Sequence, residues 1–142
     1  MREGGCFCGA VRYQAQGEPR ALAHCHCLDC RRSSGALFVT WAEYRDEDFR
    51  FTAGVPARRV HPPEVERTFC PACGTTLTFR RKPGQVDITV ASMDTLEGLP
   101  QEQFHLWTVR KPAWLELGGD SPRYPRNRPG AGEGPPVLPS EP

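Results

Sequence analysis

The chain has 142 residues, a length that fits a single domain. It carries 18 basic and 17 acidic residues, and the net charge of +1 argues against non-specific nucleic-acid binding, which needs a marked basic excess. No apolar run approaches the roughly 18–20 residues that span a bilayer, and the first residues lack the apolar stretch of a secretory signal. We therefore expect a cytoplasmic protein with no nucleic-acid or membrane partner; the sequence leaves its oligomeric state open.

Most of the predicted elements are short strands separated by turns. Alternating or β-branched apolar stretches predict strands over residues 10–15, 36–41, 49–52, 65–69, 75–80, 86–91, 104–109 and 114–117. Helix is expected only as short turns, over residues 28–34 and after Asp94, which we interpret as a helix cap.

These elements predict a mainly β protein with a small antiparallel sheet over residues 1–124. From Pro125 onward the composition changes, because residues 125–142 contain six prolines and three glycines and few apolar residues. Such a composition cannot bury a core, so we expect a disordered tail without a function of its own.

Seven cysteines are the most informative feature of the sequence. An odd number cannot all pair as disulfides, and clustered cysteines in a reducing compartment are more often metal ligands or redox groups. All seven fall into three clusters, which are Cys6-x-Cys8, Cys25-x-Cys27-x-x-Cys30 and Cys70-x-x-Cys73. The number divides naturally into four and three.

Cys70 and Cys73 have the spacing of a metal-binding turn. Two thiolates three residues apart can coordinate one metal ion. Gly74 suits a backbone position with positive φ. Zinc takes four such sulfurs, so a partner pair is needed, and Cys6 and Cys8 are our candidates. Zinc held by both pairs would staple distant parts of a thin core.

The middle cluster, Cys25, Cys27 and Cys30, could then coordinate a second zinc ion on three sides. A fourth position left open is typical of catalytic or ligand-binding zinc. His24 or His26 could fill it, although neighbours on an extended segment point in opposite directions.

Two other interpretations of the cysteines stay open. The chain could have one closed site and three spare thiols. Cys70 and Cys73 could also form a redox pair, but such a pair usually precedes a helix, and here Gly74 and a strand follow.

The three clusters and their surroundings resemble the glutathione-dependent formaldehyde-activating enzyme family, which also includes centromere protein V. The resemblance is carried by residues 5–13, 25–35 and 69–75, and a similar C-terminal pattern occurs at 105–107 and 111–114. It spans roughly residues 4–124, and the three clusters in this order are highly specific.

This resemblance implies a zinc-stapled, mainly β fold with two Zn²⁺ per chain. Members named for the activity reversibly join formaldehyde to glutathione as carbon–sulfur lyases, which implies a substrate like S-hydroxymethylglutathione. The implied ligands are Cys6, Cys8, Cys70 and Cys73 for the structural zinc, and Cys25, Cys27 and Cys30 for a second zinc that is labile or catalytic.

The chemistry of a zinc ion held by three thiolates also favours a reaction of thiols. They donate so much charge that their zinc would be a weak Lewis acid, so we expect thiol chemistry and not hydrolysis. Arg31 or Arg32 could offset the negative charge, and His26 or His105 could move the proton of the aldehyde oxygen. The alternative is a non-catalytic zinc module for a thiol ligand or a protein partner.

Overall fold

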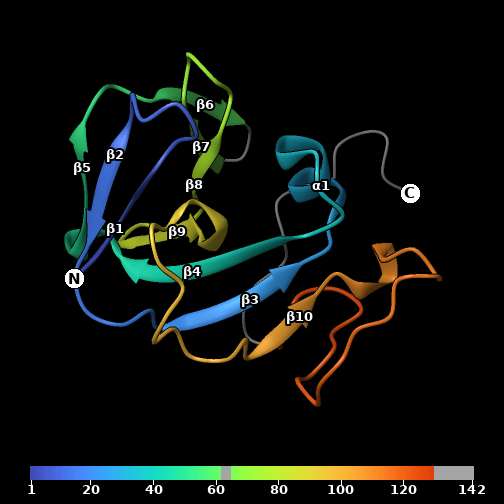
Figure 1. Ribbon diagram of the computed structural model, residues 1–142. Helices are drawn as coiled ribbons and strands as arrows, with labels where there is room; N and C mark the ends of the chain where they lie inside the picture. Colours follow the sequence, from blue (N-terminus) through green and yellow to red (C-terminus); the bar gives the residue numbers. More distant parts are fainter. Residues whose placement is uncertain (62–64, 130–142) are drawn as a thin grey trace.

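The computed structural model describes residues 1–61 and 65–129. Within these ranges the chain forms ten strands, one α-helix and three short 3₁₀ turns (Figure 1). The strands are β1 Arg2–Gly5, β2 Arg12–Ala15, β3 Ala21–Cys25, β4 Val39–Arg45, β5 Phe49–Ala53, β6 Ala57–His61, β7 Val65–Phe69, β8 Thr76–Arg80, β9 Gln85–Thr89 and β10 Phe104–Leu106. The helix is α1 Leu28–Ser34, and the 3₁₀ turns are η1 Asp46–Asp48, η2 Val90–Ser92 and η3 Thr108–Arg110.

The strands form two sheets, which confirms the mainly β fold class. The smaller sheet has the order β1-β2-β5, and the larger has the order β10-β3-β4-β9-β8-β7-β6. Every strand pair in the described ranges is antiparallel except β10 with β3, which is parallel. A parallel pair needs a long connection, and here the chain between β3 and β10 builds most of the larger sheet.

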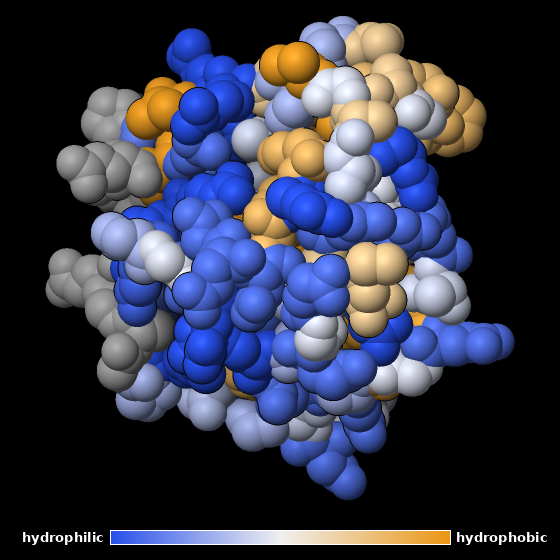
Figure 2. All heavy atoms as spheres, turned by 90° about the vertical axis from the view of Figure 1, so that its left-hand side faces the viewer, coloured by the Kyte–Doolittle hydropathy of each residue, from blue (hydrophilic) through white to orange (hydrophobic). Residues whose placement is uncertain are grey.

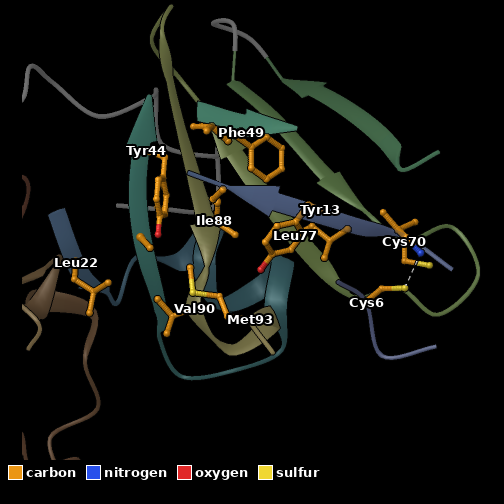
Figure 3. Close-up of a cluster of buried hydrophobic side chains, with 14 residues drawn as sticks. Cys6, Tyr13, Leu22, Tyr44, Phe49, Cys70, Leu77, Ile88, Val90 and Met93 are labelled. Atoms are coloured by element: carbon orange, nitrogen blue, oxygen red, sulfur yellow. Dashed lines mark hydrogen bonds between the residues drawn. The ribbon is translucent and has the colours of Figure 1, made fainter. Parts of the chain in front are cut away.

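The main core lies between the two sheets. Tyr13 of β2 packs in one cluster with Tyr44, Leu77 and Ile88 of the larger sheet (Figure 3). The Tyr13 hydroxyl lies 2.8 Å from Ser92 Oγ, so this buried polar group is satisfied. Two cysteines of this cluster, Cys6 and Cys70, lie side by side at its edge (Figure 3).

The outer face of the smaller sheet is polar. Gln14 Nε2 donates to Glu3 at 2.7 Å, and Arg50 donates to Gln14 at 2.9 Å. The view onto this side of the molecule is correspondingly mostly hydrophilic, with scattered apolar groups near its edge (Figure 2). One buried and one solvated face is the usual arrangement of an antiparallel sheet.

Several predicted elements are confirmed with small shifts. The strand at 65–69 and the helix at 28–34 have the expected bounds. The helix ends because Gly35 has a φ of 73°, which a glycine adopts without strain. The sequence did not predict β1, β3 or β6. In β1 the glycines weaken the strand pattern, and Gly4 leaves the room that the Tyr13 ring fills.

Two predicted elements are wrong, and a third is shorter than predicted. Residues 114–117 form no strand, since Leu115 N donates to Pro112 O in a turn and Trp114 is exposed. Asp94 starts no helix; its carboxylate pairs with Arg12 and its amide donates to Glu3 O. The strand predicted over 104–109 ends at Leu106, because the next residue turns the chain into η3.

The expected tail begins at Pro125, and residues 130–142 of it lie outside the described residues. Its first residues contact the sheet. Trp107 N donates to Arg126 O at 3.1 Å, and Trp107 Nε1 donates to Asn127 Oδ1 at 3.1 Å. None of the helices in the described ranges combines the length and apolar character that a membrane crossing requires.

Candidate metal centres

Four cysteines from two distant turns form one cluster. The sulfur atoms of Cys6, Cys8, Cys70 and Cys73 all lie within 4.8 Å of one another. The sulfur of Cys8 is 3.6 Å from that of Cys6 and 3.7 Å from that of Cys70, and all four thiols are free. This is the set of four that the spacing predicts, and it is the closed arrangement of a structural metal site.

The two turns that supply these thiols have matching backbones. Gly9 N donates to Cys6 O at 3.0 Å, and Gly74 N donates to Cys70 O at 2.8 Å. Both glycines have a φ of 79°, as expected for Gly74. Val11 N donates to Cys6 Sγ at 3.2 Å, a bond that favours the thiolate form a metal needs.

The other three cysteines meet where β3 passes into α1. Cys25 ends β3, Cys27 is the N-cap of α1 and Cys30 lies in its first turn, and their sulfurs lie within 4.8 Å of one another. Cys30 N donates to Cys27 Sγ at 3.3 Å, and Trp41 Nε1 donates to Cys30 Sγ at 3.4 Å. No histidine joins this cluster within the described ranges.

The thiols of this cluster cannot all ionise without a cation. Hydrogen bonds from the Cys25 and Cys27 thiols hold the pKa of Cys30 well below its usual value. The bonds that Cys25 makes to Cys27 and Cys30, together with burial, raise the pKa of Cys25 well above its usual value. Three sulfur atoms that share one negative charge form a donor set that suits a thiophilic metal ion.

A cavity of about 170 Å³ opens beside these three thiols. Aromatic and aliphatic side chains line it, namely Trp41, Phe79, Phe104, Leu106 and Trp107. None of the four clustered thiols of the other centre lines it. All three thiols of this centre line the cavity, whereas two of the four-thiol centre, Cys6 and Cys73, line a separate surface pocket.

Trp107 shapes this cavity through an unusual backbone. It is the one non-glycine residue of the described chain with positive φ, at 57°. Arg126 stacks 5.6 Å from the Trp107 ring, and Asn127 accepts the indole hydrogen bond. Strained residues of this kind persist where the surroundings hold them, often at functional sites.

Charged groups ring the cavity. Its cations are Arg67, Arg81, Lys82 and Arg128, and its acids are Asp29, Glu43 and Asp87. Arg67 lies 4.7 Å from the centre of the Phe79 ring, and its charge contributes to the low pKa of Cys30. It occupies the position that we expected for Arg31 or Arg32, neither of which lines the cavity.

Asp87 of β9 is a partly buried acid of the cavity wall. Burial raises its pKa to about 7, and the neighbouring Glu43 and Cys30 act in the same direction. Gln85 Nε2 donates to Asp87 Oδ2 at 3.1 Å. A carboxyl group that titrates near neutral pH inside a cavity is a candidate acid or base.

The structure does not bring the predicted histidines to the thiols' cavity. His26 Nε2 lies 3.2 Å from His105 Nδ1, and His24 Nδ1 lies 2.8 Å from Thr40 Oγ1. None of the three histidines is among the cavity's lining residues. A catalytic role for His26 or His105 stays a prediction.

Sequence reasoning did not single out Arg67, Asp87 or Trp107. Asp87 occupies the polar position of an alternating strand, and a polar position is ordinarily solvated. Only its place in the assembled sheet buries it. No local signal distinguishes Arg67 from the other arginines of the chain.

Comparisons with known proteins place the chain in a family. The family described as "Glutathione-dependent formaldehyde-activating enzyme" matches residues 1–110. A Halomonas elongata protein, provisionally named a glutathione-dependent formaldehyde-activating enzyme, is 29% identical over 127 residues, which cover 82% of this chain and 81% of that protein. An uncharacterized lyase of Schizosaccharomyces pombe is 32% identical over 77 residues, covering 54% of this chain and 56% of the lyase.

A crystal structure of a Rhodobacter sphaeroides protein has the same fold. It superposes with a TM-score of 0.57 at 24% identity, covering 85% of this chain and 98% of that one.

Proposed function

Because the chain belongs to the glutathione-dependent formaldehyde-activating enzyme family, we propose that it is a zinc-dependent carbon–sulfur lyase for a thiol–aldehyde adduct. The adduct is S-hydroxymethylglutathione or a close relative. In this proposal Cys6, Cys8, Cys70 and Cys73 bind one structural zinc ion, and Cys25, Cys27 and Cys30 bind a second one beside the substrate.

One observation carries the proposal. Of the two cysteine clusters, the cluster with three thiols lines the cavity, whereas the cluster with four does not. A metal ion in the first cluster would have three protein sulfurs and room for a further ligand. When bound there, zinc would supply a soft acceptor for the sulfur of the substrate.

The side chains around the cavity have complementary roles. Arg67 offsets the negative charge that several sulfurs bring together, and its stacking on Phe79 holds it in place. Phe79 and Trp107 exclude water, which strengthens this attraction. Arg81, Lys82 and Arg128 suit the carboxylates of a peptide thiol, and Glu43 suits its ammonium group.

Asp87 supplies the proton transfer. As the adduct breaks, its carboxylate accepts the proton of the hydroxymethyl oxygen, the electron pair of that O–H bond forms the carbonyl, and the carbon–sulfur bond electrons leave with the thiolate. The products are formaldehyde and a thiolate, and the proton stays on Asp87. In the reverse direction the same carboxyl returns the proton to the aldehyde oxygen as the thiolate adds.

The proposal is tested with reduced protein reconstituted with Zn²⁺ or Co²⁺. We expect two ions bound by thiols, of which one is removed easily by a chelator. Glutathione should change the thiolate-to-cobalt charge-transfer band of that ion, and exchange spectroscopy should show faster interconversion of glutathione and its formaldehyde adduct.

The Cys27→Ser variant is the control, and it should lose both the labile ion and the acceleration. A single tightly held ion with three free thiols would contradict the proposal. Metal binding without any acceleration of the exchange would instead favour a non-catalytic thiol-binding module.

A further inference from the structure

A second group of potential ligands lies behind the wall of the cavity. In the parallel pair of β3 and β10, His24 is directly opposite His105. Ala23 and Cys25 line the cavity, and since side chains alternate along a strand, His24 points to the other face of the sheet. Phe104 and Leu106 likewise line the cavity, so His105 also points away from it.

We propose that His24, Glu102 and His105 form a metal site of their own, for a divalent transition ion such as Zn²⁺. One ring nitrogen of each histidine and one carboxylate oxygen of Glu102 lie within 4.8 Å of one another. Two imidazoles and a carboxylate are a ligand set of zinc and related borderline metals, with a position left for water. This donor set is distinct from both cysteine clusters.

The hydrogen bonds of the two histidines fit this role. His24 uses Nδ1 toward Thr40 Oγ1 at 2.8 Å, and His105 uses Nδ1 toward His26 Nε2 at 3.2 Å. Each ring therefore has Nε2 left for another partner. Metal-binding histidines characteristically engage their second nitrogen in such an orienting bond.

The Nε2 atom of His105 is the strongest single observation in favour of this metal site. His105 is 3% exposed, and its Nε2 is buried without a hydrogen-bond partner among residues 1–61 and 65–129. An unpaired buried polar atom costs free energy, which a metal ion at this position would recover. His26 also has an unpaired buried nitrogen, Nδ1, but only His105 has two further ligand groups within reach.

Two charged groups of opposite sign lie near His105, which are Glu102 and Arg123. Glu102 provides the compensating negative charge, and Ser121 Oγ donates to its carboxylate at 3.4 Å. His24 and Glu102 are both partly exposed, which gives an ion a path from solvent.

Such an ion would stabilise the wall of the cavity from the opposite face of the sheet. Its ligands His105, in β10, and Glu102, just before β10, would be tied through the ion to His24 in β3, next to Cys25. Since Phe104 and Leu106 on the opposite face of β10 line the cavity, the ion would fix the wall they form.

The test is metal stoichiometry, with Glu102→Gln compared against Glu97→Gln, a change at an exposed carboxylate outside the group. Reduced protein is equilibrated with buffered Zn²⁺, and the zinc bound per chain is measured. We expect Glu102→Gln to bind one ion fewer than the parent protein and Glu97→Gln to bind the same number. With Co²⁺, the ion lost should have no thiolate charge-transfer band.

Imidazole ¹⁵N spectra of the parent protein give a readout that does not depend on a variant's folding. Once the thiols are saturated, further Zn²⁺ should shift the ring nitrogens of His24 and His105 and leave those of His61 unchanged. Equal stoichiometry in both variants, or unshifted His24 and His105 signals, would overturn the proposal. Neither readout uses activity, so failure of the lyase proposal gives a different result.

Discussion

At Asp87 the proposed role in proton transfer is linked to a cost in stability. Its pKa is raised from 3.8 to about 7, mainly by burial. The folded protein therefore holds the proton more tightly than the unfolded chain does. As pH rises from about 4 to about 7, the unfolded carboxyl ionises first, so the folded state loses stability across this window and the loss is complete above it.

We expect Asp87→Asn to be more stable than the parent protein at pH 8, by an amount on the order of a few kcal/mol, and about equal to it near pH 4. Its lyase rate should fall roughly 10²–10⁴-fold and lose the rise through pH 7 that a carboxylate base gives. Urea unfolding at the two pH values and a pH–rate profile check both parts. A variant that gains stability at pH 8 and keeps full activity would remove Asp87 from the mechanism.

The cation beside the three thiols comes from a distant part of the chain. Sequence proximity to Cys30 favours Arg31 and Arg32, but α1 directs neither of them to the cavity. Arg67 arrives from β7, far along the chain, and stacks on Phe79. Nearness in sequence favoured Arg31 and Arg32, whereas the structure places Arg67 beside Cys30; a role for Arg31 or Arg32 stays a prediction.

At the level of elements, the matching turns at Cys6–Gly9 and Cys70–Gly74 decide how the two sheets are joined. The first turn connects β1 to β2 in the smaller sheet, and the second connects β7 to β8 in the larger. The four thiols therefore lie where the two sheets meet, at the edge of their shared core. The three-thiol cluster, by contrast, involves only β3 and α1 of the larger sheet.

This difference predicts opposite effects for two serine substitutions. We expect Cys73→Ser to lose the metal ion of the four-thiol cluster and to unfold at much lower temperature, because structural zinc contributes directly to folding. Cys27→Ser should lose the other ion and the activity while keeping a cooperative transition near that of the parent protein. Thermal unfolding and metal analysis of both variants check this; a Cys73→Ser protein as stable as the parent would exclude a structural role.

The elements that local patterns miss have a common physical cause. The glycines of β1 and the charged residues of β6 carry little strand signal, and β3 holds one histidine and one cysteine. Pairing with neighbouring strands, not intrinsic preference, keeps these segments extended. Asp94 is the converse case, because its pairing with Arg12 overrides the local signal for a helix cap.

On the scale of the whole molecule, the first residues after Pro125 return to the cavity. Asn127 and Arg128 both line it, and Arg128 lies 4.7 Å from the Phe104 ring centre. The proposed boundary between domain and tail at residue 124 therefore separates two cavity residues from the sheet that they contact.

We expect a chain ending at residue 129 to keep its activity. A chain ending at residue 124 should bind glutathione about tenfold more weakly or worse, because a charged hydrogen-bonding group is worth roughly 1.5–3 kcal/mol. Calorimetric titration of both truncated proteins with glutathione, beside the full chain, measures this. Equal affinity in the two would show that the residues after 124 contribute nothing to substrate binding.

The sequence by itself determined the division of the cysteines into four and three, the mainly β class and the positive φ at Gly74. These properties are local, since a two-thiol turn is specified by a few adjacent residues and a strand by alternation. The tertiary structure alone decided which side chains face the cavity. Strand order brought Asp87 and Arg67 to the thiols, and the alternation that points Cys25 into the cavity turns His24 to the opposite face of the sheet.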